Sequence, residues 1–281
     1  MTIKTEIRNS FDKHAADYDK SAKIQREIGL RLFERLDYLK ISPRYILDLG
    51  CGTGFFSRLL KKKYRQAEVI SLDFSFNMLL EAQHKQSWRH QWFLVNADMV
   101  KMPFAEGVFD LIFANQTLHW DYPVATVLCE MNRVMNTEGC LMFSTLGPDT
   151  FKELVEAWSA VDHYTHTNQF IDMHNLGDAL MRECFLDPVV DQELLTGHYA
   201  SLTALLTSLK KQGMRNISQS RHVGLTGRQA RGAFNQAYEL FCTPEGRYPL
   251  TYEVVYGQAW KGTKRRSGQG TEAYIPVSQI R

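Results

Sequence analysis

The residues with the clearest capacity for chemistry lie between Asp48 and Gly54, where the sequence reads D-L-G-C-G-T-G. Glycines at alternate positions let the chain turn sharply and let a ligand lie against bare backbone. The turn follows an apolar run at 45–49 and opens a helical segment at 55–64, whose first N–H groups are unpaired. A dinucleotide fingerprint would need its third glycine where Phe55 stands, so another kind of ligand is indicated. A glycine-rich turn without a ligand is the simpler alternative.

Three further polar residues stand at the ends of short apolar runs, namely Asp73, Asp98 and Asn115. Taken alone, an acid in such a place is more often a helix cap or a solvated charge. The carboxyl ends of parallel strands meet at one edge of a sheet, however, and ligands bind there. The joint order of these residues and the glycine turn therefore predicts one shared binding site.

The segments that must position these residues alternate between strand and helix. Short apolar runs stopped by turn residues are typical of buried parallel strands, and Ser75 is expected to cap the helix after the second strand. The alternation predicts an α/β fold with a doubly wound, mostly parallel sheet and helices on both faces. The expected strands span 45–49, 68–73, 92–95, 109–114 and 139–146, and the expected helices span 55–64, 75–86 and 124–135.

The pattern changes on both sides of this core. Residues 7–40 read as helical with a break near 17–20, and further helices are expected at 149–161, 175–184, 202–211 and 227–241, with strands at 188–195 and 250–260. One domain is predicted, composed of an N-terminal helical segment (1–40), a ligand-binding core (41–146), helical insertions (147–175 and 200–245) and a closing strand (246–260), followed by a basic tail (261–281). Insertions in these places are expected to form a lid over the carboxyl ends of the strands.

The composition is that of an ordinary soluble globular protein, because 44% of the 281 residues are hydrophobic and 23% are charged. No apolar run approaches the roughly 20 residues of a membrane-spanning helix, and the N-terminus lacks the apolar segment of a secretory signal. Five dispersed cysteines without a C-x-x-C pair favour reduced thiols in a cytoplasmic protein. A net charge of +2 gives no support for nucleic-acid binding.

The pattern D-x-G-x-G-x-G after the first expected strand resembles motif I of the class I S-adenosylmethionine-dependent methyltransferases. That resemblance implies a Rossmann-like fold with seven strands and S-adenosylmethionine as cofactor, with S-adenosylhomocysteine as product and no metal. It also implies that Asp73 accepts the ribose hydroxyls, that Asp98 receives the adenine amino group, and that Asn115 faces the methionine part. The candidate cofactor-binding residues are Asp48, Gly50, Cys51, Gly52, Gly54, Asp73, Phe74, Met78, Asp98, Met99 and Asn115.

Four blocks outside this motif point to a narrower family. They read F-x-x-x-A-x-x-Y-D from Phe11, N-x-x-x-x-W from Asn115, S-L-K-x-x-G from Ser208 and G-R-Y-P-L-T-Y from Gly246. Together they resemble the malonyl-acyl carrier protein O-methyltransferases of biotin synthesis, and the last two blocks are the more specific. The resemblance implies methylation of the free carboxylate of a malonyl thioester, carried on acyl carrier protein or on CoA, to give the methyl ester that primes pimeloyl synthesis.

A carboxylate acceptor is already ionised at neutral pH, so the chemistry needs alignment and exclusion of water rather than a general base. A cation bound to the acceptor aids binding but damps its nucleophilicity, so we expect one basic residue to hold only part of it. Arg221 is the first candidate, followed by Arg247 and Lys210. Each of them is equally well explained as a solvated surface charge.

Aromatic residues complete the set of candidates. Tyr18 is expected either to close over the cofactor or to pack between helices, and Trp120 to form the pocket wall. Tyr252 either lines the same pocket or fills the sheet. His119 could be read as a base, which this chemistry does not require.

An acyl carrier protein is acidic, so the surface that meets it is expected to be basic. Basic residues gather in the second insertion and in the tail, at Lys210, Lys211, Arg215, Arg221, Arg228, Arg231, Lys261, Lys264, Arg265 and Arg266. Such a face would also suit RNA, but no nucleic-acid-binding module is recognisable. The H-x-x-H sequence at His163 and His166 is a weak metal motif.

Two other functions remain open from the sequence. One is a methyltransferase that acts on another small molecule, such as trans-aconitate, a quinone or a sterol. The other is a non-catalytic assembly factor that keeps the fold, although such proteins often lose cofactor residues, and here Asp48, the three glycines, Asp73 and Asp98 are present.

Overall fold

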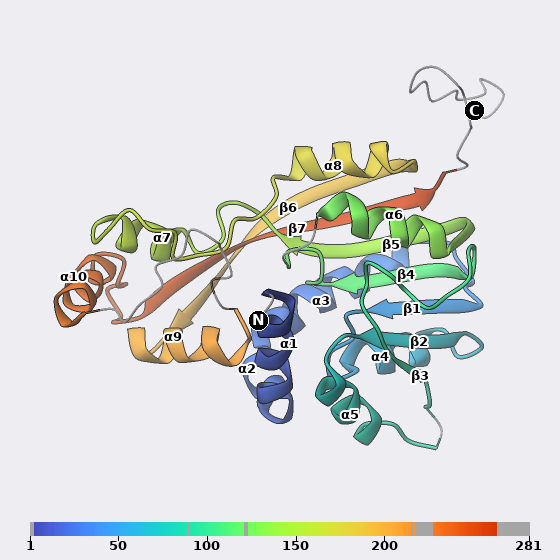
Figure 1. The fold of residues 1–281 in the computed structure, drawn as a ribbon, viewed down its shortest axis with the longest axis horizontal. Helices are drawn as coiled ribbons and strands as arrows, with labels where there is room; N and C mark the ends of the chain where they lie inside the picture. The colour runs from blue at the N-terminus through green and yellow to red at the C-terminus, as the bar shows by residue number, and fades with distance from the viewer. Residues whose placement is uncertain (1–2, 89, 121–122, 215, 217–226, 263–281) are drawn as a thin grey trace.

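The computed structural model describes residues 3–88, 90–120, 123–214, 216 and 227–262. Within these residues, seven strands form one sheet in the order β3-β2-β1-β4-β5-β7-β6 (Figure 1). Strands β1 to β5 run parallel, whereas β7 is antiparallel to both β5 and β6. The predicted α/β fold is thus confirmed. The strands are β1 (Tyr45–Leu49), β2 (Glu68–Asp73), β3 (Phe93–Asn96), β4 (Phe109–Asn115), β5 (Met135–Leu146), β6 (Phe185–Tyr199) and β7 (Tyr248–Lys261).

Helices connect these strands and cover both faces of the sheet, as the alternating pattern predicts. Ser75 caps α5 as expected, since its hydroxyl accepts a hydrogen bond of 3.2 Å from the Met78 N–H. The helices are α1 (Ile3–His14), α2 (Tyr18–Ser21), α3 (Lys23–Arg35), α4 (Phe55–Lys63), α5 (Phe76–His84), α6 (Val124–Val134), α7 (Lys152–Ser159), α8 (Met173–Arg182), α9 (Leu202–Lys211) and α10 (Arg228–Glu239), with 3-10 turns at Ala15–Asp17 and Leu36–Tyr38.

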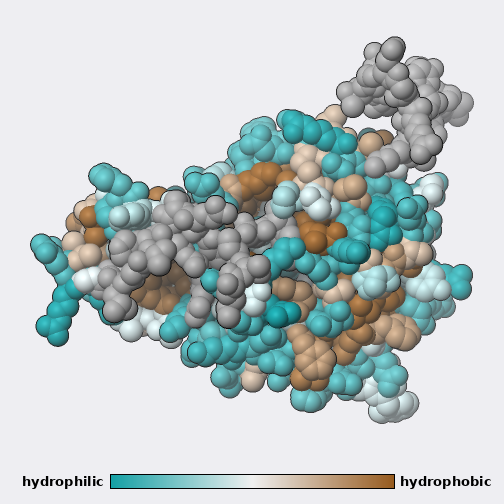
Figure 2. Space-filling view, in the orientation of Figure 1, coloured by the Kyte–Doolittle hydropathy of each residue, from teal (hydrophilic) through white to brown (hydrophobic). Residues whose placement is uncertain are grey.

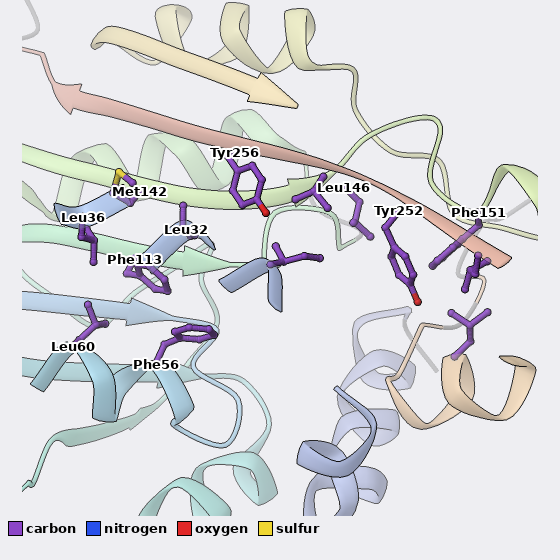
Figure 3. Close-up of a cluster of buried hydrophobic side chains, with 14 of the residues drawn as sticks. Leu32, Leu36, Phe56, Leu60, Phe113, Met142, Leu146, Phe151, Tyr252 and Tyr256 are labelled. Atoms are coloured by element: carbon purple, nitrogen blue, oxygen red, sulfur yellow. The ribbon is translucent and has the colours of Figure 1, made fainter. Parts of the chain in front are cut away.

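Two buried clusters hold the layers together, one on each face of the sheet. Successive residues of a strand point to opposite faces, so Ile46 belongs to one cluster and Leu47 to the other. The first cluster packs α3 and α4 against the sheet, and Figure 3 shows Leu32 and Leu60 beside Phe113. The second packs α6 and α8 against the opposite face. The apolar runs that predicted β1, β2, β4 and β5 are therefore buried on both sides, whereas β3 at the sheet edge is half-buried or exposed.

Additional helices interrupt the late strands of the sheet. α7 and α8 lie between β5 and β6, and α9 and α10 lie between β6 and β7. Strand β6 spans 15 residues, longer than the predicted 188–195, and its ribbon with β7 extends past the parallel strands toward α7, α9 and α10 (Figure 1). Its residues alternate between exposed and half-buried, and such a strand has a weaker apolar signal than a buried one.

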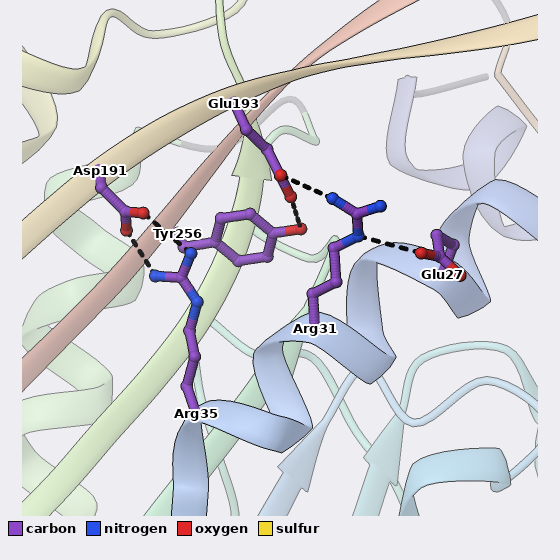
Figure 4. A network of polar contacts seen from close by, with 6 residues as sticks. All are labelled: Glu27, Arg31, Arg35, Asp191, Glu193 and Tyr256. Carbon is purple, nitrogen blue, oxygen red and sulfur yellow. Dashed lines mark hydrogen bonds and ion pairs between the residues drawn. The ribbon is translucent and has the colours of Figure 1, made fainter. Parts of the chain in front are cut away.

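Charged side chains fasten α3 to the long ribbon, as Figure 4 shows. Arg35 donates to both carboxylate oxygens of Asp191, at 2.5 and 2.8 Å, and its guanidinium lies 4.1 Å from the centre of the Tyr256 ring. Glu193 accepts from the Arg31 guanidinium at 2.7 Å and from the Tyr256 hydroxyl at 2.6 Å. This network fixes α3 against the sheet, and α3 contributes residues to the cavity described below.

On the face shown in Figure 2, the coloured surface is mainly polar, with some apolar side chains over α5. Phe76 of that helix is 58% exposed and Leu80 is 37% exposed. Among the described residues, no helix combines the length and the apolar character that crossing a membrane requires.

Candidate active site

A cavity opens at the carboxyl ends of β1, β2, β3 and β4, next to the N-terminal helices. Counting the part open to solvent, its empty space is about 1150 Å³, which is enough for a ligand the size of a nucleoside conjugate. Gly54 and Asp98 do not line it. The other candidate cofactor residues do, namely Asp48, Gly50, Cys51, Gly52, Asp73, Phe74, Met78, Met99 and Asn115.

The three glycines of the turn have different tasks, although all have positive φ. A Cβ on Gly50 would lie 2.6 Å from the Thr117 hydroxyl oxygen, so the turn is tightly packed there. A Cβ on Gly52 would meet only the Tyr18 ring, at 4.0 Å, so this glycine leaves its backbone open to the cavity. A Cβ on Gly54 would lie 2.9 Å from the Ala82 Cβ, which makes Gly54 a packing residue between α4 and α5.

Asp73 is held with its carboxylate at the floor of the cavity. One oxygen accepts the Gly52 N–H and the other accepts the Ser75 N–H, both at 2.8 Å. Each oxygen keeps a further lone pair, so the group can still accept two hydroxyl donors. Burial raises the pKa of Asp73 to about 6.

The shift of Asp73 predicts a pH-dependent affinity for S-adenosylhomocysteine. Because the ligand-free carboxyl takes up a proton as the pH falls through about 6, it loses acceptor capacity, and we expect weaker binding at pH 5 than at pH 8. Calorimetric titrations across that range measure the effect. Asp73→Asn should bind more weakly but without this dependence. An unchanged wild-type affinity from pH 5 to pH 8 would contradict the assignment.

Two other buried groups beside the turn do not offer reactive atoms. Asp48 accepts from the Ser57 hydroxyl at 2.5 Å, and burial raises its pKa to about 7. Burial also raises the pKa of the Cys51 thiol, so this cysteine is not a thiolate nucleophile. Both residues shape the turn, which agrees with reading Cys51 as a small turn residue.

Asp98 stands at the expected end of β3, but its carboxylate points toward α1. One oxygen pairs with the Lys4 ammonium at 3.0 Å and the other accepts the Val100 N–H at 3.1 Å. Its neighbours Ala97 and Met99 line the cavity instead. The Asp98 carboxylate is therefore not positioned to receive the adenine amino group, contrary to what the sequence leads us to expect.

An aromatic cluster from distant parts of the chain covers one side of the cavity. The Phe11 ring lies 5.1 Å from that of Trp120, 6.1 Å from Phe74 and 6.2 Å from Tyr18, measured between ring centres. All four line the cavity, as expected for Tyr18 and Trp120. Phe11 is absent from the sequence candidates because only tertiary packing brings α1 to the ends of β2 and β4.

Arg26 also lines the cavity, although the sequence does not single it out as a site residue. Arg26 of α3 places its guanidinium 4.7 Å from the centre of the Phe55 ring and donates to the Asp19 carbonyl at 3.2 Å. The Asp19 carboxylate in turn accepts from the Thr53 hydroxyl at 2.6 Å and from Lys85. Among the described lining residues, Arg26 alone carries a permanent positive charge. Nothing in the helical pattern of α3 distinguishes it from other surface arginines.

The loop after β4 carries buried polar atoms that face the cavity. Both ring nitrogens of His119 and the side-chain nitrogen of Gln116 are buried with no hydrogen-bond partner among the described residues. Burial lowers the pKa of His119 to about 3, so the imidazole is neutral. Gln116 has a φ of 57°, and its backbone N–H is fixed by Ser144 at 3.0 Å.

The described acceptor-binding candidates of the late blocks, Lys210, Arg247 and Tyr252, do not line the cavity. Lys210 is exposed on α9 and does not line it, whereas Gln212 and Met214 do. Arg247 is exposed in the turn before β7, at the outer end of the ribbon (Figure 1). Tyr252 is 1% exposed and packs 5.1 Å from the Phe151 ring, which is the sheet-filling alternative (Figure 3). Arg221 lies outside the described residues.

Of the two histidines of the H-x-x-H sequence, His163 is exposed and His166 packs against an aromatic ring. His166 stacks on Trp158 with ring centres 3.9 Å apart and bonds Asp162 at 2.8 Å. Across the part of the chain that the structure describes, no group of three or more His, Cys, Asp and Glu side chains could hold a metal ion.

Comparison with known proteins agrees with this geometry. Residues 47–143 match a methyltransferase domain family. The YcgJ protein of Bacillus subtilis, a solved structure, shares the fold with a TM-score of 0.57 and 16% identity over 83% of this chain and 98% of its own.

Two curated relatives define the family more narrowly, and both are named malonyl-[acyl-carrier protein] O-methyltransferase. The protein of Legionella pneumophila is 58% identical over 100% of this chain and 99% of its own length. That of Gallionella capsiferriformans is 41% identical over 95% of this chain and 94% of its own. The chain therefore belongs to the malonyl-[acyl-carrier protein] O-methyltransferase family.

Proposed function

We propose that this enzyme transfers a methyl group from S-adenosylmethionine to the free carboxylate of a malonyl group carried on acyl carrier protein. The observation that carries the proposal is the cavity at the ends of four strands, where Asp73 and the open backbone at Gly52 meet. The choice of substrate rests on the family, because relatives that align over 95–100% of this chain are named for that reaction.

The residues present fit the cofactor. Gly52 leaves a cradle that a side chain would narrow, and Asp73 keeps lone pairs for the ribose hydroxyls. Because the strands run in the order β3-β2-β1-β4, the adenine belongs beside Met99, the ribose at Asp73, and the methionine part beside Asn115. Arg26 can then pair with the amino-acid carboxylate of the cofactor.

The chemistry asks little of the protein beyond placement. When bound, S-adenosylmethionine supplies the methyl group, which passes to a carboxylate oxygen. The acceptor is ionised at neutral pH, so no residue has to remove a proton. The aromatic cluster of Phe11, Tyr18, Phe74 and Trp120 excludes water from the reacting groups, and the loop after β4 orients the acceptor.

Acyl carrier protein is acidic, and the end of α9 offers a basic surface next to the cavity. Lys210 and Lys211 are exposed there, immediately before Gln212, which lines the cavity. Lysines at the end of a helix also complement its dipole, so their charge has a structural explanation too. A test of partner binding must therefore separate these two roles.

Reversing both charges, with Lys210→Glu and Lys211→Glu, is expected to raise KM for malonyl-acyl carrier protein by about 10-fold. KM for a short malonyl-pantetheine thioester should change little, because that substrate lacks the acidic protein. Steady-state kinetics at low and high salt provide the measurement. Matched reversals at Lys40 and Lys62, which are also exposed, should leave both KM values unchanged. An equal loss on both substrates would argue against carrier-protein docking at α9.

The alternatives predict different results in simple assays. An assembly factor would show no measurable affinity for S-adenosylmethionine in a binding titration. A methyltransferase for another small molecule would label trans-aconitate or a quinone with a higher kcat/KM than malonyl-acyl carrier protein. Comparing malonyl-acyl carrier protein, malonyl-CoA, free malonate and trans-aconitate in one experiment therefore tests the acceptor.

A further inference from the structure

Three polar side chains that line the cavity have buried atoms without a hydrogen-bond partner among the described residues. These are His119 through both ring nitrogens, Gln116 through its amide nitrogen and Gln25 through its amide oxygen. A buried polar atom without a partner destabilises a fold by about 1–3 kcal/mol, and such atoms are rare in native proteins. Their gathering at one cavity indicates that a ligand completes them.

The position of these atoms excludes the adenosine part of the cofactor as their ligand. Adenosine belongs at β3 and β2, whereas Gln116 and His119 follow β4, the strand next to β5 in the sheet. The His119 ring is enclosed by Trp120, at 4.9 Å, and by Phe170, at 6.0 Å. Gln212 and Met214 line the same cavity from the end of α9. This part of the cavity therefore belongs to the methyl-transfer region and the acceptor.

The hydrogen-bond donors of His119 and Gln116 suit an acceptor carboxylate, which must keep its negative charge in order to attack the methyl group. A neutral imidazole keeps one N–H donor, and the Gln116 amide offers two. A cation bound to the acceptor carboxylate would withdraw charge from the oxygen that attacks, whereas neutral donors bind the other oxygen and leave the negative charge on the acceptor. Arg26, the cation of the cavity, contacts Asp19 and Phe55 close to the glycine turn, on the side that we assign to the cofactor.

We infer that His119 and Gln116 bind the acceptor carboxylate by neutral hydrogen bonds to the oxygen that does not attack. This inference rests on the proposed function and replaces the basic residue expected from the sequence. The second oxygen forms a bond to the methyl carbon as the carbon–sulfur bond breaks, and the sulfur keeps that electron pair. No proton moves. The product ester is neutral and accepts weaker hydrogen bonds, which favours its release.

His119→Phe tests the inference because it keeps the ring and removes both nitrogens. We expect kcat/KM for malonyl-acyl carrier protein to fall by about 30-fold, the size expected for a hydrogen bond to a charged group. His119→Gln retains an N–H donor but cannot take up a proton, so it should recover most of the activity. A general-base role predicts the opposite, an inactive His119→Gln variant. His84→Phe, at an exposed histidine of α5, is the matched control and should match the wild type.

A binding measurement separates this inference from the proposed function. With S-adenosylhomocysteine bound, the wild type should bind malonyl-acyl carrier protein more tightly than acetyl-acyl carrier protein, which lacks the carboxylate. In His119→Phe, the ratio of the affinity for malonyl-acyl carrier protein to that for acetyl-acyl carrier protein should fall by about 10-fold. Gln116→Leu should lower this ratio as well. The affinity for S-adenosylhomocysteine should stay unchanged in both variants. A wild type without the preference would overturn the proposed function. A wild type with the preference, together with variants that keep it, would overturn the role of His119 and Gln116.

Discussion

Replacement of Asp73 by alanine is expected to lower the affinity for S-adenosylmethionine by about 100-fold or more. The carboxylate can accept both ribose hydroxyls, and hydrogen bonds to a charged group each contribute about 1.5–3 kcal/mol. The same carboxylate orders the turn through the Gly52 N–H and the helix start through the Ser75 N–H. Isothermal titration of purified variant and wild type measures the change.

Asp73→Ala could bind the cofactor weakly because the ribose contacts are lost or because the glycine turn is disordered. A second ligand distinguishes these two causes. An analogue of S-adenosylhomocysteine without ribose hydroxyls should bind the wild type weakly and should bind Asp73→Ala about equally weakly. Asp17→Ala, which removes an exposed carboxylate paired with Lys20, should behave as the wild type. If Asp73→Ala still preferred the natural ligand over the analogue by the wild-type factor, Asp73 would not be the ribose acceptor.

Replacement of Gly29 by alanine is expected to destabilise the fold and to impair the site at the same time. A Cβ there would lie 2.1 Å from Cζ of Phe56 and 2.7 Å from the Asn115 side-chain nitrogen. Phe56 is itself buried in the core, so α3 must move, and overpacking of this kind destabilises by about 1–3 kcal/mol. Because α3 also carries Arg26, we expect a lower melting temperature and weaker cofactor binding together.

Gly232 of α10 provides the matched control, since a Cβ there would meet nothing within 4 Å. Gly232→Ala should stabilise the protein slightly, because alanine is favoured over glycine in helices by about 1 kcal/mol. Thermal unfolding and cofactor titration of the two variants test whether α3 packs closely against Phe56 at Gly29. Equal stability of Gly29→Ala and the wild type would show that α3 does not press on Phe56.

The sequence identifies most of the cavity residues at the strand ends, because the determinants of their positions are local. Asp73 and Asn115 stand at the ends of their strands, and the glycine turn comes directly after β1. Parallel strands bring their carboxyl ends together. The exception is Asp98, which occupies the right strand end but pairs with Lys4. An ion pair across 94 positions leaves no local pattern in the sequence.

The part of the cavity lining that comes from helices is predicted poorly, because packing between distant segments creates it. Phe11 and Arg26 reach the cavity only when α1 and α3 dock on the sheet. The late block from Ser208 is the right segment, but the residue that faces the cavity is Gln212, not Lys210. The period of α9 would have indicated this, since Gln212 lies seven positions after the buried Leu205 and so shares its face.

His119 illustrates a further limit of sequence reasoning. It lies within the N-x-x-x-x-W pattern that begins at Asn115, so the sequence draws attention to it. Only the structure reveals that both of its ring nitrogens are buried without a partner among the described residues. Burial lowers the pKa of this histidine to about 3 and keeps it neutral, as the inferred donor role requires. The inference that neutral donors, rather than an arginine, bind the acceptor carboxylate rests on these buried nitrogens.

The most direct test of the central claim is mass spectrometry of malonyl-acyl carrier protein after incubation with the wild-type enzyme and S-adenosylmethionine. We expect the carrier to gain one methyl group as an ester that mild base removes as methanol, while acetyl-acyl carrier protein gains none. An unmodified malonyl carrier, or equal methylation of the acetyl carrier, would contradict methyl transfer to the malonyl carboxylate.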